Sequence, residues 1–281
     1  MPRRIKLRPV DRPDTLVISG GGTRGIVALG AIHALHENGF LDDVKHYVGT
    51  SAGAFMAAVC ATRQSCVEVL KRMWNRPFKG SVDVACLGTS FGFDNGTSLQ
   101  RWVDSNLGLH GTFRDVSRTH GTNLVVCVTD VTSKCPAYWS TRTAETLDVG
   151  FAVRVSCSVP IIFGAVSVGP NMYTDGCVCD NAPWRYAVDV LGAKRVLLIV
   201  FDSTSVDDPS SGPRSLDAYV SILMEARLND LPATQRELSV VTVLKVHVSH
   251  SGLDFDVPPD EMDSLFKDGY RQGLLFVKKH V

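Results

Sequence analysis

Gly49-Thr50-Ser51-Ala52-Gly53 lies between two segments of different character. Residues 44–48 before it predict a short strand, and the small apolar residues at 52–61 after it predict a helix. A G-x-S-x-G sequence between a strand and a helix is typical of the nucleophile elbow, a strained turn that exposes a serine hydroxyl. The glycines permit the tight turn, and the helix N-terminus places unpaired N–H groups beside the serine. The sequence therefore predicts that Ser51 is a nucleophile.

A second glycine-rich turn, Gly20-Gly21-Gly22-Thr23-Arg24-Gly25, follows a predicted strand at 15–19. It matches the dinucleotide-binding pattern G-x-G-x-x-G, which requires an acidic residue at the end of the second strand. That position belongs to Ser51, so the sequence argues against NAD. Consecutive glycines also supply backbone N–H groups for an oxyanion, as in lipases, and this interpretation is favoured. Arg24 adds positive charge at the turn, with a surface salt bridge as its alternative role.

Strands alternate with helices along the chain, which predicts an α/β fold with a mostly parallel sheet. We expect a basic arm at residues 1–13 and a single domain at 14–281, with a loop at 80–96 and a mobile connection at 207–214. Ser98 is a candidate helix cap. Further strands are expected at 124–129, 195–201 and 240–248, and helices at 26–40, 63–79, 98–107, 216–231 and 260–279.

Composition limits the classes of function. Lys+Arg and Asp+Glu balance at 29 each, so no overall charge favours nucleic acid. No apolar run is long enough for a membrane span and no secretory leader is evident, so we expect a cytoplasmic or peripherally membrane-associated protein.

The eight cysteines are expected to be buried, reduced thiols. A metal site at Cys177-Val178-Cys179 is the weaker alternative, since no matching ligand pair follows zinc spacing. The basic residues 1–8 predict a solvated tail or, less readily, contact with anionic lipid.

The base that would activate Ser51 is not fixed by spacing. His247 closes a late predicted strand, with His250 near it, which would suit a Ser–Asp–His triad. Asp175, followed by a glycine, would suit an exposed functional carboxylate. Asp130 and Asp202 also follow predicted strands, although carboxylates there are more often turn formers. The alternatives remain open on this ground.

Three motifs in order resemble the patatin-like phospholipase family: the 20–25 turn, the 49–53 elbow and Asp175-Gly176. The resemblance extends over about residues 15–201. It includes Gly92-Phe93-Asp94-Asn95-Gly96, the stretch 152–160 and Asn181-Ala182-Pro183. Cys177 and Val155 depart from the family's usual small residues without removing a catalytic group.

The resemblance implies a three-layer sandwich and a Ser–Asp dyad, with Ser51 as nucleophile and Asp175 as proton acceptor. It implies hydrolysis of fatty acyl esters of phospholipids or acylglycerols through an acyl-enzyme, with no metal or cofactor and with transient contact with a membrane surface. A need for a protein activator is undetermined. No inflection near the histidine pKa is then expected in the pH–rate profile. The implied oxyanion hole comprises Gly20, Gly21, Gly22, Arg24, Gly25 and Ala52, with Gly49, Gly53 and Gly176 as motif glycines.

Predicted apolar walls for an acyl channel are Phe55, Met56, Phe91, Phe93, Ile161, Ile162 and Phe163. Ordinary core packing is the alternative role for most of them. Two other functions remain: a non-catalytic lipid-binding member of the same fold, and an ordinary esterase that uses His247.

Overall fold

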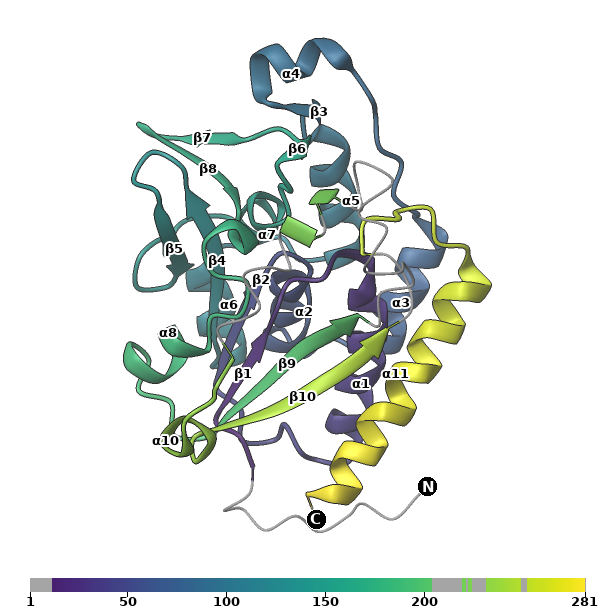
Figure 1. The fold of residues 1–281 in the computed structure, drawn as a ribbon, viewed down its shortest axis with the longest axis vertical. Coiled ribbons are helices and arrows are strands. Elements are labelled where there is room, and N and C mark those ends of the chain that lie inside the picture. Colours follow the sequence, from purple (N-terminus) through teal and green to yellow (C-terminus); the bar gives the residue numbers. More distant parts are fainter. Residues whose placement is uncertain (1–11, 204–218, 221, 224–230, 249–251, 281) are drawn as a thin grey trace.

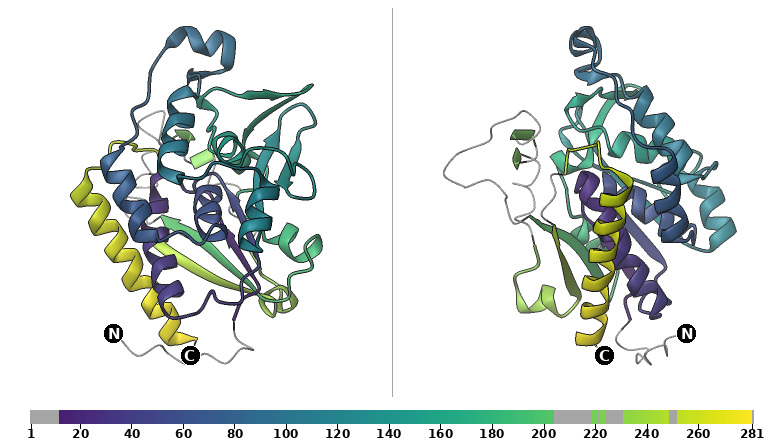
Figure 2. Two further views of the ribbon diagram at one scale, coloured as in Figure 1. Left: turned by 180° about the vertical axis from the view of Figure 1, so that it is seen from behind. Right: turned by 90° about the vertical axis from the view of Figure 1, so that its right-hand side faces the viewer.

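The computed structural model describes residues 12–203, 219–220, 222–223, 231–248 and 252–280. Within these ranges a large β-sheet runs through the middle of the molecule, and helices pack on both of its faces (Figures 1 and 2). The predicted three-layer α/β architecture is therefore confirmed.

The sheet is parallel over most of its width. Its strand order is β10 (Val241–Val248), β9 (Val196–Ser203), β1 (Thr15–Ile18), β2 (His46–Thr50), β4 (Asn123–Asp130), β8 (Asn171–Asp175) and β7 (Val166–Val168). All neighbours from β10 to β4 are parallel. β8 and β7 continue the sheet with antiparallel pairings, and β5 (Cys135–Ser140) pairs antiparallel with β4. The carboxyl ends of the central strands thus meet at one edge, where open α/β sheets place their sites.

The strand β1 contributes to a separate core on each face of the sheet, because successive side chains of a strand point to opposite faces. Leu16 and Ile18 belong to the larger core, which they share with α1, α2 and α11. Val17 belongs to a smaller core with Trp184 at the start of α8.

The helices of the described residues are α1 (Gly25–Glu37), α2 (Ala52–Ala61), α3 (Cys66–Asn75), α4 (Val84–Ser90), α5 (Thr97–Leu107), α6 (Phe113–His120), α7 (Val149–Ser156), α8 (Trp184–Asp189), α10 (Gln235–Leu238) and α11 (Pro259–Lys279), with short 3-10 turns η2 (Gly22–Arg24) and η3 (Gly176–Val178).

Two expectations are wrong. The segment 80–96 is not a plain loop: it contains α4 and the strand β3 (Gly92–Asp94), which pairs with β6 (Ile161–Phe163). Ser98 does not cap α5, because Gly96 holds that position and the Ser98 hydroxyl donates to the carboxylate of Asp94. The predicted connection at 207–214 lies outside the described residues, as does most of the predicted helix at 216–231.

Candidate active site

Ser51 occupies a strained turn between the end of β2 and the start of α2. Its φ is +54°, a left-handed value that costs a non-glycine residue on the order of 1–3 kcal/mol. Glycine is required on both sides, because a Cβ at Gly49 would collide with the Gly53 carbonyl and one at Gly53 with the Ile18 carbonyl. The predicted elbow geometry is therefore present, and Ser51 is 4% exposed.

Asp175, at the end of β8, lies beside Ser51. The Ser51 Oγ donates a hydrogen bond of 2.8 Å to Asp175 Oδ2, across 124 positions of sequence. The other carboxylate oxygen accepts from the Cys177 N–H at 2.9 Å. Gly176 lets this turn pass close to β4, since a Cβ there would collide with the Cys127 carbonyl.

The other candidate bases lie in different surroundings. His247 is on β10, where its Nδ1 is 3.3 Å from Asp202 Oδ2, and β9 and β1 separate its strand from β2. Asp130 accepts hydrogen bonds from the N–H and hydroxyl of Ser133, as a turn former does. His250 lies outside the described residues. The fold thus brings only Asp175, among the described candidates, to Ser51.

Burial changes the acidity of Asp175. The side chain is fully buried, and this desolvation raises the pKa of its carboxyl from 3.8 to about 6, although hydrogen bonds from Cys177 and Ser51 favour the charged form. A carboxylate of this pKa is still mostly ionised at neutral pH and is a stronger base than an exposed aspartate. The pKa of Asp175 therefore lies close to the ordinary pKa of a histidine side chain, about 6.5.

The glycine turn offers some of its N–H groups to the site and uses others internally. The Gly20 N–H donates to Asn181 Oδ1 at 2.8 Å. The Gly25 N–H donates to the Gly22 and Thr23 carbonyls. Within the described part of the chain, the N–H groups of Gly21, Gly22 and Ala52 donate no hydrogen bond. These three N–H groups therefore remain available to a ligand.

Arg24 folds back onto the turn instead of extending outward. It is 5% exposed, and its Nε donates to the Gly21 carbonyl at 3.2 Å. The guanidinium also packs against Gly252, where an added Cβ would lie 2.8 Å from Nε. Arg24 and Ser51 line the same small hollow.

Two polar residues that the motifs did not single out support the site. Ser156 Oγ accepts from the Ser51 N–H at 2.8 Å and donates to the Cys127 carbonyl at 2.6 Å. These two hydrogen bonds tie the elbow to β4. Asn181 Oδ1 accepts from both Gly20 N–H and, at 3.0 Å, Cys177 Sγ. Cys177 is thus accommodated as a buried donor. Both supporting residues lie in stretches that carried the family resemblance, which was the available signal.

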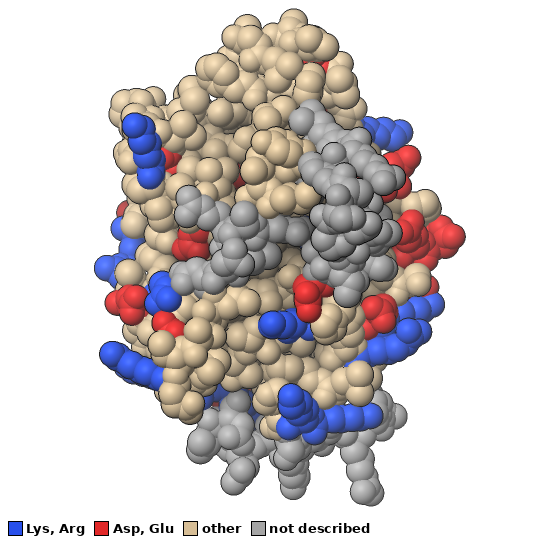
Figure 3. Space-filling view, in the orientation of Figure 1, with Lys and Arg blue, Asp and Glu red and all other residues tan. Residues whose placement is uncertain are grey.

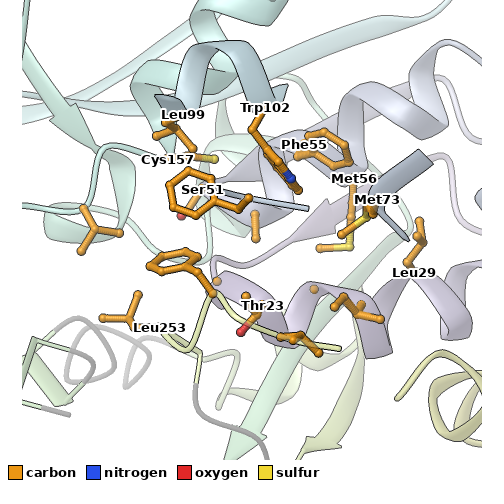
Figure 4. A pocket seen from close by; sticks show the side chains of 18 of the residues that line it. Thr23, Leu29, Ser51, Phe55, Met56, Met73, Leu99, Trp102, Cys157 and Leu253 are labelled. Atoms are coloured by element: carbon orange, nitrogen blue, oxygen red, sulfur yellow. The ribbon is translucent and has the colours of Figure 1, made fainter. Parts of the chain in front are cut away.

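An apolar cavity of about 890 Å³, counting space open to solvent, leads away from Ser51 (Figure 4). Phe55, Met56 and Phe163 line it, as predicted. Phe91 and Ile161 do not: they are 57% and 38% exposed. Phe93 and Ile162 are also outside the lining. The remaining large apolar side chains of the wall are Ile26, Leu29, Met73, Phe78, Leu99, Trp102, Val159, Leu253, Phe255, Val257 and Met262.

The described residues provide neither a metal cluster nor a membrane span. No three His, Cys, Asp or Glu side chains among them gather as metal ligands, and the eight cysteines are free thiols. None of the described helices combines the length and apolar character that crossing a bilayer requires.

A family model for patatin-like phospholipases matches residues 16–188. Because this is more than half of the 281 residues, the chain belongs to the patatin-like phospholipase family, as its motifs predicted.

Individual relatives are distant. Probable lipid hydrolase 463L of invertebrate iridescent virus 6 is 22% identical over 184 residues, 62% of this chain and 63% of that protein. Lysophospholipase NTE1 of Kluyveromyces lactis is 29% identical over 221 residues, 74% of this chain but 14% of the relative. The crystal structure of VipD from Legionella pneumophila superposes with a TM-score of 0.63 at 18% identity, over 96% of this chain and 67% of that one. The last likeness shows a shared fold.

Proposed function

We propose that this protein is a lipid acyl hydrolase that cleaves fatty acyl esters through a Ser51–Asp175 dyad. The 2.8 Å hydrogen bond between the two side chains is the observation that supports it most. The strained elbow and the apolar cavity that opens beside the serine add to it. Family membership supports the lipid substrate, a phospholipid or an acylglycerol.

In the first half-reaction, Asp175 accepts the proton of Ser51 as the seryl oxygen attacks the ester carbonyl. The N–H groups of Gly21, Gly22 and Ala52 would stabilise the tetrahedral oxyanion, with the charge of Arg24 behind the turn. Collapse of this intermediate breaks the ester bond, and the leaving alcohol takes the proton from Asp175. The acyl chain, now bound to Ser51, lies along the apolar cavity.

In the second half-reaction, water gives a proton to Asp175 and attacks the acyl-enzyme. The same N–H groups hold the second oxyanion. When this intermediate collapses, Ser51 regains its proton and the fatty acid leaves. No imidazole enters the path, and no metal or cofactor is used.

Covalent labelling tests the nucleophile directly. A fluorophosphonate probe should add one mass per chain, on the peptide that contains residues 49–53, and Ser51→Ala should abolish the label. Turnover of a soluble short-chain ester should disappear in the same variant. A folded, active protein that is labelled elsewhere would overturn the proposal, and binding of lipid without any ester turnover would favour the non-catalytic alternative.

A further inference from the structure

Residues 81–94, which we call the apolar tip, project beyond the rest of the molecule. They comprise α4 and β3 and lie at the top of Figure 1, and both views of Figure 2 show the same projection. None of the α4 residues is buried, so this helix contributes nothing to either core. A segment that forms regular structure without entering the core needs another explanation.

The exposed surface of the apolar tip is hydrophobic. Val82, Val84 and Phe91 are 84%, 70% and 57% exposed, and Ile161 of the adjoining β6 adds a further exposed side chain. Between Gly80 and Phe93 the sequence has one charged residue, Asp83, whose carboxylate caps α4 by accepting the Ala85 N–H. Figure 3 shows this end of the molecule as almost uncharged surface. Scattered apolar side chains are ordinary on a protein surface, whereas a group of them on one charge-poor projection indicates an interaction site.

The base of the apolar tip is closed by hydrogen bonds around Asp94, which is 2% exposed. One of its carboxylate oxygens accepts from the N–H and the hydroxyl of Ser81, at 2.9 and 3.1 Å. The Asp83 N–H donates to the Phe93 carbonyl at 2.8 Å, and the Gly164 N–H to the Asp94 carbonyl at 2.7 Å. The apolar side chains are therefore held outward by a buried polar anchor.

The backbone is also strained in the apolar tip and in the adjoining β6. Phe91 and Ile161 have φ values of +65° and +73°, in the region that bulky residues disfavour. They lie at neighbouring positions of the β3–β6 pair, where Ile161 is the partner of Gly92. Phe91 ends α4 in the left-handed conformation that glycine usually provides, so an exposed phenylalanine is kept there at a conformational cost that ending the helix does not require.

The apolar tip is continuous with the wall of the substrate cavity. Phe78, just before the tip, and Phe163, on β6, both line the cavity, and their ring centroids are 5.8 Å apart. Phe255 packs against both rings. Aromatic packing thus links the cavity wall, through the buried ring of Phe163, to the strand pair that carries the tip.

We propose that the apolar tip inserts into the surface of a lipid bilayer and so sets the active site against its lipid substrate. The role of insertion, bringing the active site to its substrate, rests on the proposed function. The insertion itself does not require catalysis. The tip has almost no charge, so the partner is the apolar part of the interface and not a cluster of anionic head groups. The contact should therefore persist on neutral, zwitterionic membranes and at high salt.

The test compares the full chain with a Val82→Ser/Phe91→Asn variant in sedimentation with phosphatidylcholine vesicles. Asparagine is chosen because it tolerates a positive φ. Removal of two apolar side chains of this size should reduce partitioning onto vesicles by at least about tenfold, at both low and high salt. A Leu238→Ser/Leu275→Ser variant is the matched control, since these residues are 50% and 65% exposed far from the tip in sequence. It should bind like the wild type.

Turnover of a soluble short-chain ester separates the two proposals. It should be unchanged in the tip variant, which shows that the fold and the active site are intact. Unchanged vesicle binding by the tip variant would overturn the insertion while leaving the hydrolase standing. Vesicle binding by a wild type that turns over no ester would overturn the hydrolase while leaving the insertion standing. A wild-type dimer that the tip substitutions convert to a monomer would assign the surface to a second copy of the chain and overturn the proposal.

Discussion

Two carboxylates stand at the ends of strands of the same sheet, each beside a residue suited to catalysis, yet their surroundings differ completely. Asp175 is fully buried and accepts a hydrogen bond from Ser51. Asp202 pairs with His247 on the neighbouring strand, and 46% and 63% of these two side chains are exposed. The second pair looks like the acid and base of a triad in sequence but is a solvent-exposed contact in the structure, and exposed contacts of this kind are worth at most about 1 kcal/mol.

Under the proposed mechanism, the two pairs differ in burial and backbone strain more than in residue type. The Asp202 and His247 side chains are both largely exposed to solvent. Exclusion of water raises the pKa of Asp175, and the strained turn presents Ser51 to it. Substitutions at the two pairs should therefore have very unequal effects.

The largest effect is expected from Asp175→Asn, which keeps the shape of the side chain but removes its capacity to accept a proton. Turnover should fall on the order of 10³-fold or more, close to the loss in Ser51→Ala, and the double variant should be hardly worse because the two residues act as one unit. The matched change Asp202→Asn, and also His247→Ala, should each stay within about tenfold of the wild type. Steady-state kinetics on a soluble ester compare all five variants with the wild type. A folded His247→Ala as inactive as Ser51→Ala would replace the dyad by a triad.

A second large effect is expected in the glycine turn. Gly22 has a φ of +57°, and an added Cβ would collide with the Gly252 carbonyl, so Gly22→Ala should displace the neighbouring N–H groups. Loss of one oxyanion donor costs about 10²–10³ in rate, and kcat should fall by that amount. Gly121→Ala is the control: its φ of +67° is similar, but nothing lies within 4 Å of the added Cβ. Equal kcat in both variants would show that the turn donates nothing to the oxyanion, provided that their circular dichroism spectra agree.

The sequence predicted the parts of this site that are local. The elbow and the glycine turn are continuous motifs, and each ends a strand whose apolar run is evident. The choice of Asp175 over His247 came from family resemblance, because the Ser51–Asp175 contact spans 124 residues and spacing does not encode it. For the same reason the engagement of the Gly20 N–H was not foreseen, since Asn181 is 161 positions away.

The segment 80–96 was missed for a different physical reason. Its glycines and serines are typical of loops, and β3 is too short to show an alternating pattern. Its strand partner, β6, lies far along the chain, and the turn before α4 is held by the buried carboxylate of Asp94, which accepts from the Ser81 N–H. Tertiary contacts here outweigh local propensity.

A more moderate effect is expected from pH. With the pKa of Asp175 at about 6, the ionised base is lost below that value, so kcat/KM on a soluble ester should fall about tenfold for each unit of pH below it. We therefore now expect an inflection in the pH–rate profile near the pKa of histidine, where the family resemblance alone predicted none. The inflection should persist unchanged in His247→Ala. Its disappearance in that variant would assign the titration to the imidazole.

The smallest effect concerns stability. Because burial raises the folded-state pKa of Asp175 above its unfolded value of 3.8, the folded protein binds more protons between these values. The contribution of this group is therefore most favourable below pH 3.8 and is lost as pH rises to about 6, at a cost on the order of 3 kcal/mol above that pH. Asp175→Asn, which cannot ionise, should melt a few degrees higher than the wild type at pH 7 and show less advantage at pH 5. Asp202→Asn should change the melting temperature little at either pH. If Asp175→Asn instead melts lower at pH 7, the hydrogen bonds to the carboxylate outweigh its desolvation, and the raised pKa would be wrong.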